Sequence, residues 1–333
     1  MDAYPKNTKE FEARFRDEES CLRYILGIRW PEGYECPFCH SKRKSWLKSG
    51  GKLKCGDCGK SFSITSGTVF QDSHTPLTVW FRIMWHLCLQ KNGLSALGLQ
   101  RSLGLGTYKT AWLCLHKLRK AMVRRGREKL SGSIEADEAY IGGEREGKRG
   151  RGADGKILVF VAVEDRSYKD EETKRFHRLL GRIRLQVISD ASSHSLEEAV
   201  KDNIQTGSTV TTDGWRGYGF LESPNYTRKI QVAKQEIRTD ANDENPFGEM
   251  EHKIGFDSHL PCCHLVISLL KRWILGTLQG SLGKEHAQDY LNEFVFRFNR
   301  RNSKSRGMLF WRLVQLSIDS GPTTLKQIIP PHI

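Results

Sequence analysis

Two aspartates and a histidine are the residues of this chain best placed to do chemistry. Asp137 lies in the run IEADEAYIGG, and Asp213 lies in the run TTDGWRGY. Both runs have β character and lead into glycine, so each carboxylate is expected near a strand end. His264 and Lys271 are seven positions apart in a segment with helical periodicity, which puts them on one helix face. Two strand-end acids and a third group on a helix are typical of metal-dependent phosphoryl transfer.

The two aspartates suit a site with two metal ions. Such chemistry needs oxygen ligands that hold the ions ~3.5–4 Å apart. Asp137 is placed to bridge both ions, and Asp213 to complete one coordination shell. The alternative to a metal ligand is a structural role, in which an aspartate near a strand end caps a turn. Glu135 should share a face with Asp137, because side chains alternate along a strand, and it either supports the site or is solvated. Glu138 points the other way.

Four cysteines follow the spacing C-x₂-C-x₁₅-C-x₂-C. They are Cys36, Cys39, Cys55 and Cys58. Tetrahedral zinc takes four such thiolates, and a two-residue gap lets a tight turn aim a pair of them at one ion. Gly50-Gly51 between the pairs predicts a hairpin that brings them together. A closed all-cysteine shell has no open position, so this zinc is predicted to be structural. His40 is a competing ligand that the full quartet disfavours.

A second pattern resembles a helix-turn-helix. Helical segments at 94–102 and 107–123 are joined by the glycine-containing turn LGLG, and a third helix is predicted at 77–89. Ala111 begins an apolar stripe on the second segment, whereas Lys109, Thr110, Lys117, Arg119 and Lys120 occupy other positions. The start of that segment, with Tyr108, is the end that would reach base edges, and later basic groups would contact phosphates. A helical hairpin that only packs a core is the alternative.

The overall charge favours a nucleic-acid partner. The 333 residues include 53 basic and 39 acidic side chains, a formal net charge of +14. Contacts between basic side chains and phosphates release condensed counterions, which favours binding. A surplus of this size therefore indicates a protein that binds a polyanion, rather than a basic protein without such a partner. We see no signal peptide, and the apolar segment at 77–89 is too short to span a bilayer. We therefore expect a cytoplasmic protein with no membrane partner.

The order of patterns predicts an α+β chain of several parts. These are a helical lead-in (1–30), a zinc ribbon (31–70), a helix-turn-helix segment (76–124), a catalytic domain (130–305) and a C-terminal tail (306–333). β character in the catalytic part is concentrated at 133–141, 157–163, 182–188 and 209–212. Helices are predicted at 194–204, 262–277 and 284–300.

These motifs together resemble the bacterial insertion-sequence transposases that join a zinc ribbon to an RNase H-like DDE domain, the ISXO-type group. Besides the cysteines and the aspartates, the resemblance rests on ordered runs along nearly the whole chain. The runs are FSITSGT, YKTAW, DGWRGY, LKRW with a following GT, and FVFRFNRR. The resemblance implies an RNase H-like α/β domain with a mixed sheet.

The resemblance also implies roles for single residues. The catalytic metals, Mg²⁺ or Mn²⁺, fall to Asp137, Asp213 and His264, and contacts to double-stranded DNA fall to Lys271 with Arg272. The third position is a histidine where the family has a carboxylate or, in some branches, asparagine. Magnesium prefers oxygen, so manganese suits this set better, unless Glu249 or Glu251 supplies an oxygen.

Two other interpretations of His264 stay open at this point. It is either an ordinary helical histidine or, with His259, Cys262 and Cys263, part of a second zinc cluster, which the adjacent cysteines disfavour because they cannot easily point at one ion.

The preferred hypothesis is a transposase that binds terminal inverted repeats, cleaves them and transfers the strand, acting as a homodimer or larger assembly on DNA in the bacterial nucleoid. A decayed, non-catalytic zinc-ribbon regulator is the main alternative. A host nuclease that cleaves without joining is a third.

Overall fold

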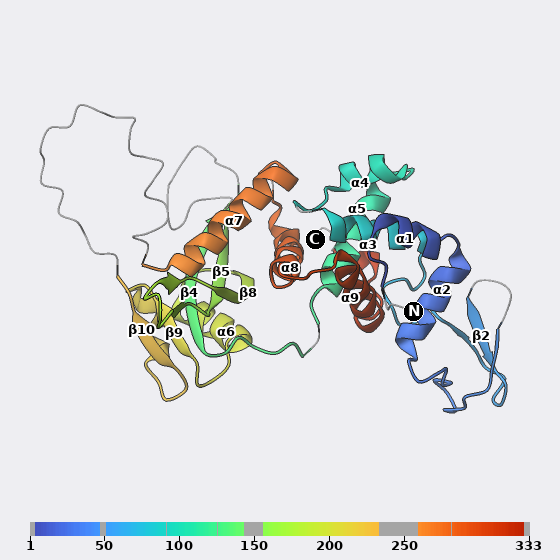
Figure 1. The fold of residues 1–333 in the computed structure, drawn as a ribbon, viewed down its shortest axis with the longest axis horizontal. Helices are drawn as coiled ribbons and strands as arrows, with labels where there is room; N and C mark the ends of the chain where they lie inside the picture. The colour runs from blue at the N-terminus through green and yellow to red at the C-terminus, as the bar shows by residue number, and fades with distance from the viewer. Residues whose placement is uncertain are drawn as a thin grey trace, which may run out of the picture. The chain divides into compact units, whose positions relative to one another are not determined.

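A computed structural model of the protein describes residues 4–46, 51–90, 92–124, 126–142, 156–232, 259–280 and 282–329. The chain forms two compact units (Figure 1). Met1–Arg127 and Arg300–Ile333 together make one, which we call the terminal unit. Glu128–Asn299 make the other, which we call the central unit. Within the described ranges, no helix combines the length and the apolar character that crossing a membrane requires.

The terminal unit is mainly helical. Its helices are α1 (Thr8–Arg14), α2 (Glu18–Arg29), α3 (Leu77–Leu89), α4 (Ala96–Leu103), α5 (Tyr108–Ala121), α9 (Arg306–Asp319) and α10 (Leu325–Ile328). An aromatic cluster holds them together, because the ring of Phe310 lies 5.4 Å from that of Phe11, 5.5 Å from Phe81 and 5.8 Å from Trp85, between ring centroids. Rings at these distances in edge-on or tilted arrangements are favourable beyond the area they bury.

The structure corrects the expected C-terminal tail at 306–333. Residues 306–319 form helix α9, and its Leu309, Phe310, Leu313 and Val314 are buried. These four positions recur at helical spacing and give α9 an apolar face, which must be covered by other helices. The chain therefore returns to the terminal unit after completing the central one.

A small antiparallel sheet completes the terminal unit. Its strands are β1 (Lys44–Trp46), β2 (Lys52–Cys55) and β3 (Ser61–Ser63), in the order β1-β2-β3. The pairing of β1 with β2 is that of the predicted hairpin. Gly51 has a φ of +65°, a conformation that glycine adopts without strain.

The central unit is built on a mixed five-stranded sheet of order β10-β9-β4-β5-β8. The strands are β4 (Ser133–Ile141), β5 (Ile157–Asp165), β8 (Leu180–Ile188), β9 (Thr209–Thr212) and β10 (Thr227–Ile230). β5 runs antiparallel to both β4 and β8, whereas β9 runs parallel to β4 and β10. A short hairpin, β6 (Tyr168–Lys169) with β7 (Phe176–His177), lies in the connection from β5 to β8.

Helices cover both faces of this sheet. They are α6 (Ser193–Asn203), the 3₁₀ helix η1 (Arg216–Leu221), α7 (Pro261–Leu278), the 3₁₀ helix η2 (Lys284–His286) and α8 (Ala287–Phe298). The odd-numbered residues from Val159 to Val163 pack with α7 and α8, and the even-numbered residues from Leu158 to Ala162 pack with α6 and η1. Two covered faces explain why β5 is continuously apolar rather than alternating. The predicted RNase H-like α+β layout is thereby confirmed.

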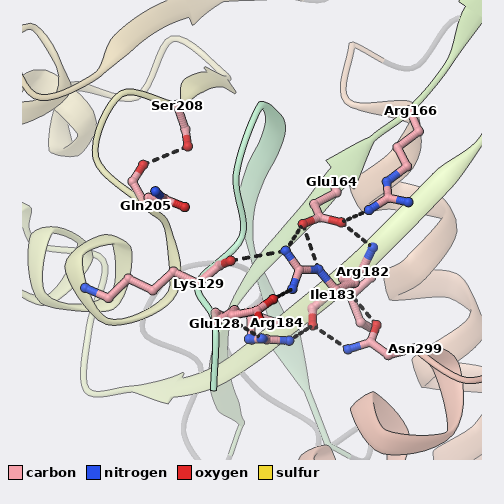
Figure 2. Close-up of polar contacts among 10 residues, drawn as sticks. All are labelled: Glu128, Lys129, Glu164, Arg166, Arg182, Ile183, Arg184, Gln205, Ser208 and Asn299. Carbon is pink, nitrogen blue, oxygen red and sulfur yellow. Dashed lines mark hydrogen bonds and ion pairs between the residues drawn. The ribbon is translucent and has the colours of Figure 1, made fainter. Parts of the chain in front are cut away.

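An ion pair between the buried Glu164 of β5 and the half-buried Arg182 of β8 anchors the start of the central unit. Glu164 Oε1 accepts hydrogen bonds from Arg182 Nε at 2.9 Å and from Arg182 Nη2 at 2.7 Å (Figure 2). The same guanidinium donates to the carbonyl of Lys129 at 3.2 Å, and Arg184 donates to the carbonyl of Glu128 at 2.7 Å. One strand therefore holds the segment by which the chain enters this unit.

The exit from the central unit is held at the same place. Asn299 Oδ1 accepts from the Ile183 amide at 2.8 Å, and Asn299 Nδ2 donates to the Ile183 carbonyl at 3.1 Å (Figure 2). The two ends of the unit are thus bonded to consecutive residues of β8.

Gly307 tests the packing of α9. A β-carbon at this position would lie 1.7 Å from the carbonyl oxygen of Pro5, so Gly307→Ala must push the helix away. We expect a loss of about 1–3 kcal/mol in the free energy of unfolding, measured by urea denaturation. Gly27→Ala is the control, because Gly27 lies in α2 with no atom within 4 Å of the added carbon. Equal stability of the two variants would contradict the close approach.

The Glu164 ion pair makes a prediction about pH. Burial by itself raises the pKa of Glu164, but the hydrogen bonds and charge of Arg182 outweigh it and lower the pKa below its ordinary 4.5. A lowered pKa stabilises the fold above the ordinary value, and this stability is lost as the pH falls through the lowered pKa. We expect Glu164→Gln to cost about 1.5–3 kcal/mol at pH 7 and to weaken the loss of stability below pH 4.5. The exposed Glu171→Gln should change neither quantity.

Candidate functional site

The parallel pairing of β4 with β9 brings the two aspartates to one level of the sheet. The register pairs Ser133 with Thr209 and Glu135 with Thr211. Asp213 directly follows β9, so continuing this register by two residues leads from the recorded pairs to Asp137 and Asp213. The expected strand-end position is found for Asp213 but was wrong for Asp137, which is the fifth of the nine residues of β4. Asp213 is not among the residues that line the cleft around Asp137 and His264.

Helix α7 brings the third group to the first aspartate. His264 lies in its first turns, and its Nε2 is 3.4 Å from Asp137 Oδ2. The hydrogen bond with Asp137 raises the pKa of His264 against the opposing effect of burial, and the charges of Asp137 and Glu135 raise it further. The imidazole is about two-fifths exposed and Asp137 about one-sixth exposed. A donor nitrogen and a carboxylate oxygen thus meet at the surface of the sheet.

A cationic cleft surrounds this pair. It is lined by Asp137 and His264 together with the basic residues Lys156, Arg178, Lys271 and Arg272. Lys271 and Arg272 are exposed on α7, two turns beyond His264. A cleft lined by Asp137, Glu138, an imidazole and four basic side chains is suited to a phosphate chain whose reacting group is bound by a metal.

Asp213 is positioned by its own turn and by a buried arginine. Its Oδ1 accepts from the Trp215 amide at 2.9 Å. Arg228 of β10 is almost buried, and it donates to the carbonyls of Trp215 at 3.0 Å and of Asp213 at 3.5 Å while pairing with Glu222. Arg228 escaped the sequence analysis, because an arginine in a short polar strand gives no local signal. It holds the turn that carries one predicted ligand.

The motif DGWRGY now has a physical explanation. Trp215 Nε1 donates to the carbonyl of Ala191 at 3.0 Å. A β-carbon on Gly217 would lie 2.4 Å from that indole nitrogen, so only glycine lets the tryptophan fold back on its own turn. Tyr218 is fully buried, and its pKa is raised first by burial and then by the charge of Glu138. Glu138 alternates with Asp137 along β4, so its side chain belongs to the other face of the sheet, the face on which Ala136 packs with Tyr218.

Glu135 is not solvated. Its side chain is buried, and Oε2 accepts from the amides of Cys262 at 2.8 Å and of Cys263 at 2.9 Å. Burial raises the pKa of Glu135. This carboxylate joins β4 to the start of α7.

Two alternative sets of metal ligands were open from the sequence, the glutamates Glu249 and Glu251 and the cluster around Cys262 and Cys263. Glu249 and Glu251 lie outside the described residues. Cys262 and Cys263 are buried, and Cys263 Sγ is directed at the Val161 carbonyl, 3.8 Å away. Among described residues, these cysteines do not gather with His259 and His264 into a metal cluster. In the described part of the chain, Cys262 instead lies with Glu135 and Asp165, one ligand atom of each being within 4.8 Å of the others.

The four predicted zinc ligands converge. All four sulfurs lie within 4.8 Å of one another, with Cys36 Sγ 3.8 Å from Cys58 Sγ and Cys39 Sγ 3.5 Å from Cys55 Sγ. Each pair sits on a tight turn closed by backbone hydrogen bonds. His40 turns away, because its Nδ1 contacts Glu35 Oε1 at 2.6 Å. This donor set suits a tetrahedral zinc ion.

Comparison with known proteins finds family matches for the central unit and for part of the terminal unit. Residues 129–299, about half of the chain, match the family described as "ISXO2-like transposase domain". This chain belongs to the ISXO2-like transposase family. Residues 16–61 match the family described as "Transposase zinc-ribbon domain". The chain is also 26% identical over 304 residues to a Halobacterium salinarum protein described as "Uncharacterized protein in transposable element ISH50", covering 85% of this chain and 91% of the relative.

In this ISXO2-like transposase, α4 and α5 form the predicted pair of helices. Ser95 caps α4, Gly104 ends it in the left-handed conformation with a φ of 63°, and Thr107 caps α5. Tyr108 and Lys109 at the start of α5 are exposed. The structure therefore presents the expected end of α5 to solvent.

The other basic residues of α5 are less accessible than the sequence suggests. Arg119 is buried, because it shares a helix face with the apolar Leu115 and Met122. Lys120 Nζ donates to the Gln327 carbonyl at 2.8 Å, and Lys117 is half-buried. The sequence analysis was wrong to place Arg119 apart from the buried stripe.

The zinc ribbon of this transposase can be tested by metal content. We expect about one zinc per chain by elemental analysis, because a closed four-sulfur shell binds one ion. Cys55→Ser should remove the zinc and leave His40→Ala, the matched control, fully loaded. Zinc retained in Cys55→Ser, or lost in His40→Ala, would contradict the assignment of these ligands.

Proposed function

We propose that this protein is a transposase that binds the terminal inverted repeats of an insertion sequence, cuts the DNA there and joins the freed end to a target. The observation that carries the proposal is the 3.4 Å approach of His264 to Asp137 in a cationic cleft of a transposase-family domain. Because its substrate is double-stranded chromosomal DNA, we expect the protein to act in the cytoplasm.

In this proposal Asp137, Asp213 and His264 hold the catalytic ions. When bound, a divalent pair activates the attacking oxygen and stabilises the leaving oxygen. Two carboxylates and an imidazole accept Mn²⁺ more readily than Mg²⁺, which prefers oxygen alone. Arg228 keeps Asp213 in place, since it holds the carbonyls on either side of that turn.

Two displacements at phosphorus account for the reaction. Water first adds to the phosphodiester at the element end, and the bond to the 3′ oxygen breaks, which leaves a 3′ hydroxyl. That hydroxyl then attacks a target phosphodiester, forming one P–O bond as another breaks. Lys271 and Arg272, exposed on α7 along the cleft, bind phosphates of the strand and orient it.

Recognition of the ends falls to the terminal unit. The start of α5, where a recognition helix meets base edges, carries Tyr108, Lys109 and Thr110. Lys117 lies two turns after Thr110 on the same face of this helix. The zinc ribbon adds a second basic module. Pairing of two element ends calls for two copies of the chain, so we propose a homodimer or larger assembly on DNA.

A strand-transfer assay tests this function. With a pre-cut end oligonucleotide and a target plasmid, wild type should form joined product in Mn²⁺. Asp137→Ala and Asp213→Ala should each lose more than about 100-fold of the rate, since a lost metal ligand costs at least as much as a lost supporting contact. His264→Glu should shift the preference towards Mg²⁺, because it restores an oxygen ligand.

The exposed Asp202→Ala on α6 is the matched control and should retain full rate. The histidine at the third position favours one competing function, a DNA-binding regulator without catalysis. Equal DNA binding and no joined product in wild type and every variant would support that regulator and overturn the transposase. Cleavage without joining would identify a nuclease instead.

A further inference from the structure

The start of α7 is bonded to a carboxylate 127 residues earlier in the chain. The first backbone amides of a helix have no acceptors within it and need them from elsewhere. Leu260, which precedes α7, supplies no side-chain cap. Glu135 supplies one, because Oε2 accepts from the amides of both Cys262 and Cys263, at 2.8 and 2.9 Å. Its negative charge also interacts favourably with the positive end of the helix dipole.

Glu135 and the Asp137–His264 contact join the same two elements. Glu135 lies two residues before Asp137 on β4 and faces the same side. The amides it accepts belong to the two residues that directly precede His264 in α7. The cap and the proposed metal ligands are therefore one residue apart on the helix and two apart on the strand.

Apolar packing alone does not fix where α7 sits along the sheet. Val266 and Leu270 pack in the cluster formed with β5, and such contacts are not directional. A slip of one residue moves a helix by ~1.5 Å and turns its side chains by ~100°. That change would take His264 away from Asp137. Two hydrogen bonds to one carboxylate oxygen select a single position and rotation of the helix.

We propose that Glu135 is a positioning residue, which sets the place and rotation of α7 so that His264 meets Asp137 at the metal site. The inference rests on the proposed function, in which His264 is a metal ligand. Glu135 does not take that role itself, since it is buried and its Oε2 already accepts two amides.

The chain contains a matched control for this inference. Glu18 of α2 caps the start of α3 in the terminal unit, accepting from the amides of Leu77 at 2.9 Å and Thr78 at 2.8 Å. Both carboxylates reach across to a helix that lacks a local side-chain cap. Glu18→Ala should thus resemble Glu135→Ala in destabilising a helix start, without touching the proposed metal site.

The test measures Mn²⁺ binding to the zinc-loaded protein by electron paramagnetic resonance of free Mn²⁺. We expect Glu135→Ala to raise the Kd for Mn²⁺ about 10-fold. Glu135→Gln keeps an acceptor oxygen and should recover most of the affinity, and Glu18→Ala should bind as wild type does. In the double variant with His264→Ala, Glu135→Ala should have no further effect, because its contribution passes through His264. Strand transfer at varied Mn²⁺ should show the same order.

Several results would overturn the inference. One is that Glu135→Ala and His264→Ala each raise the Kd for Mn²⁺ and that their effects multiply in the double variant. Another is that Glu18→Ala weakens Mn²⁺ binding as much as Glu135→Ala does. The third is that Glu135→Ala binds Mn²⁺ as wild type does. If Glu135→Ala does not fold, Glu135→Asp, shorter by one methylene, takes its place in the same cycle. Failure of the proposed function is separate, since it shows as no joined product in wild type whatever the Mn²⁺ affinities.

Discussion

The candidate site depends on the central place of β4 in its sheet. This strand pairs antiparallel with β5 on one side and parallel with β9 on the other. The parallel side pairs Glu135 with Thr211, two residues before Asp137 and Asp213, and the strand's alternation puts Glu135 and Asp137 under α7. On its opposite face Ala136 packs in the cluster that contains Tyr218. A shift of one residue in either pairing would exchange these faces and separate every group of the site.

Much of this arrangement could be predicted from local patterns. The cysteine spacing implied the convergence of four sulfurs, since two short turns leave few other geometries. Strong periodicity predicted α3 and α7, and glycine and threonine marked the ends of α4 and α5. Asp213 stands where a β run meets glycine, as the sequence predicted, whereas Asp137 lies in the middle of β4, because the sequence does not show how far a strand extends. The edge strand β10 was missed because three of its four residues are polar and three are exposed, so they carry no apolar alternation.

Contacts between distant segments could not be predicted. Glu135 and the amides of α7 are joined by a fold, not by a motif, and the same holds for Arg228 and the turn after β9. Arg119 was misplaced because a helical pattern does not say which neighbours will cover each face. The histidine at the third position is a different case. It could be identified from the sequence, and it affects the chemistry of the site rather than the fold. In the proposed metal site, an imidazole beside a carboxylate favours Mn²⁺ over Mg²⁺.

The order of segments along the chain has a consequence for how the protein is made. The terminal unit draws its core from both ends of the polypeptide, and Phe310 reaches rings of α1 and α3 from the last long helix. A growing chain leaves the ribosome from its N-terminus. Helices α1 and α3 therefore lack Phe310 in their core until the central unit and α9 have been synthesised. A product truncated before α9 would carry the cysteine turns and the α4–α5 pair on an unfinished core. Under the proposed function, a terminal unit able to bind DNA ends would therefore be complete only in polypeptides that also carry the central unit.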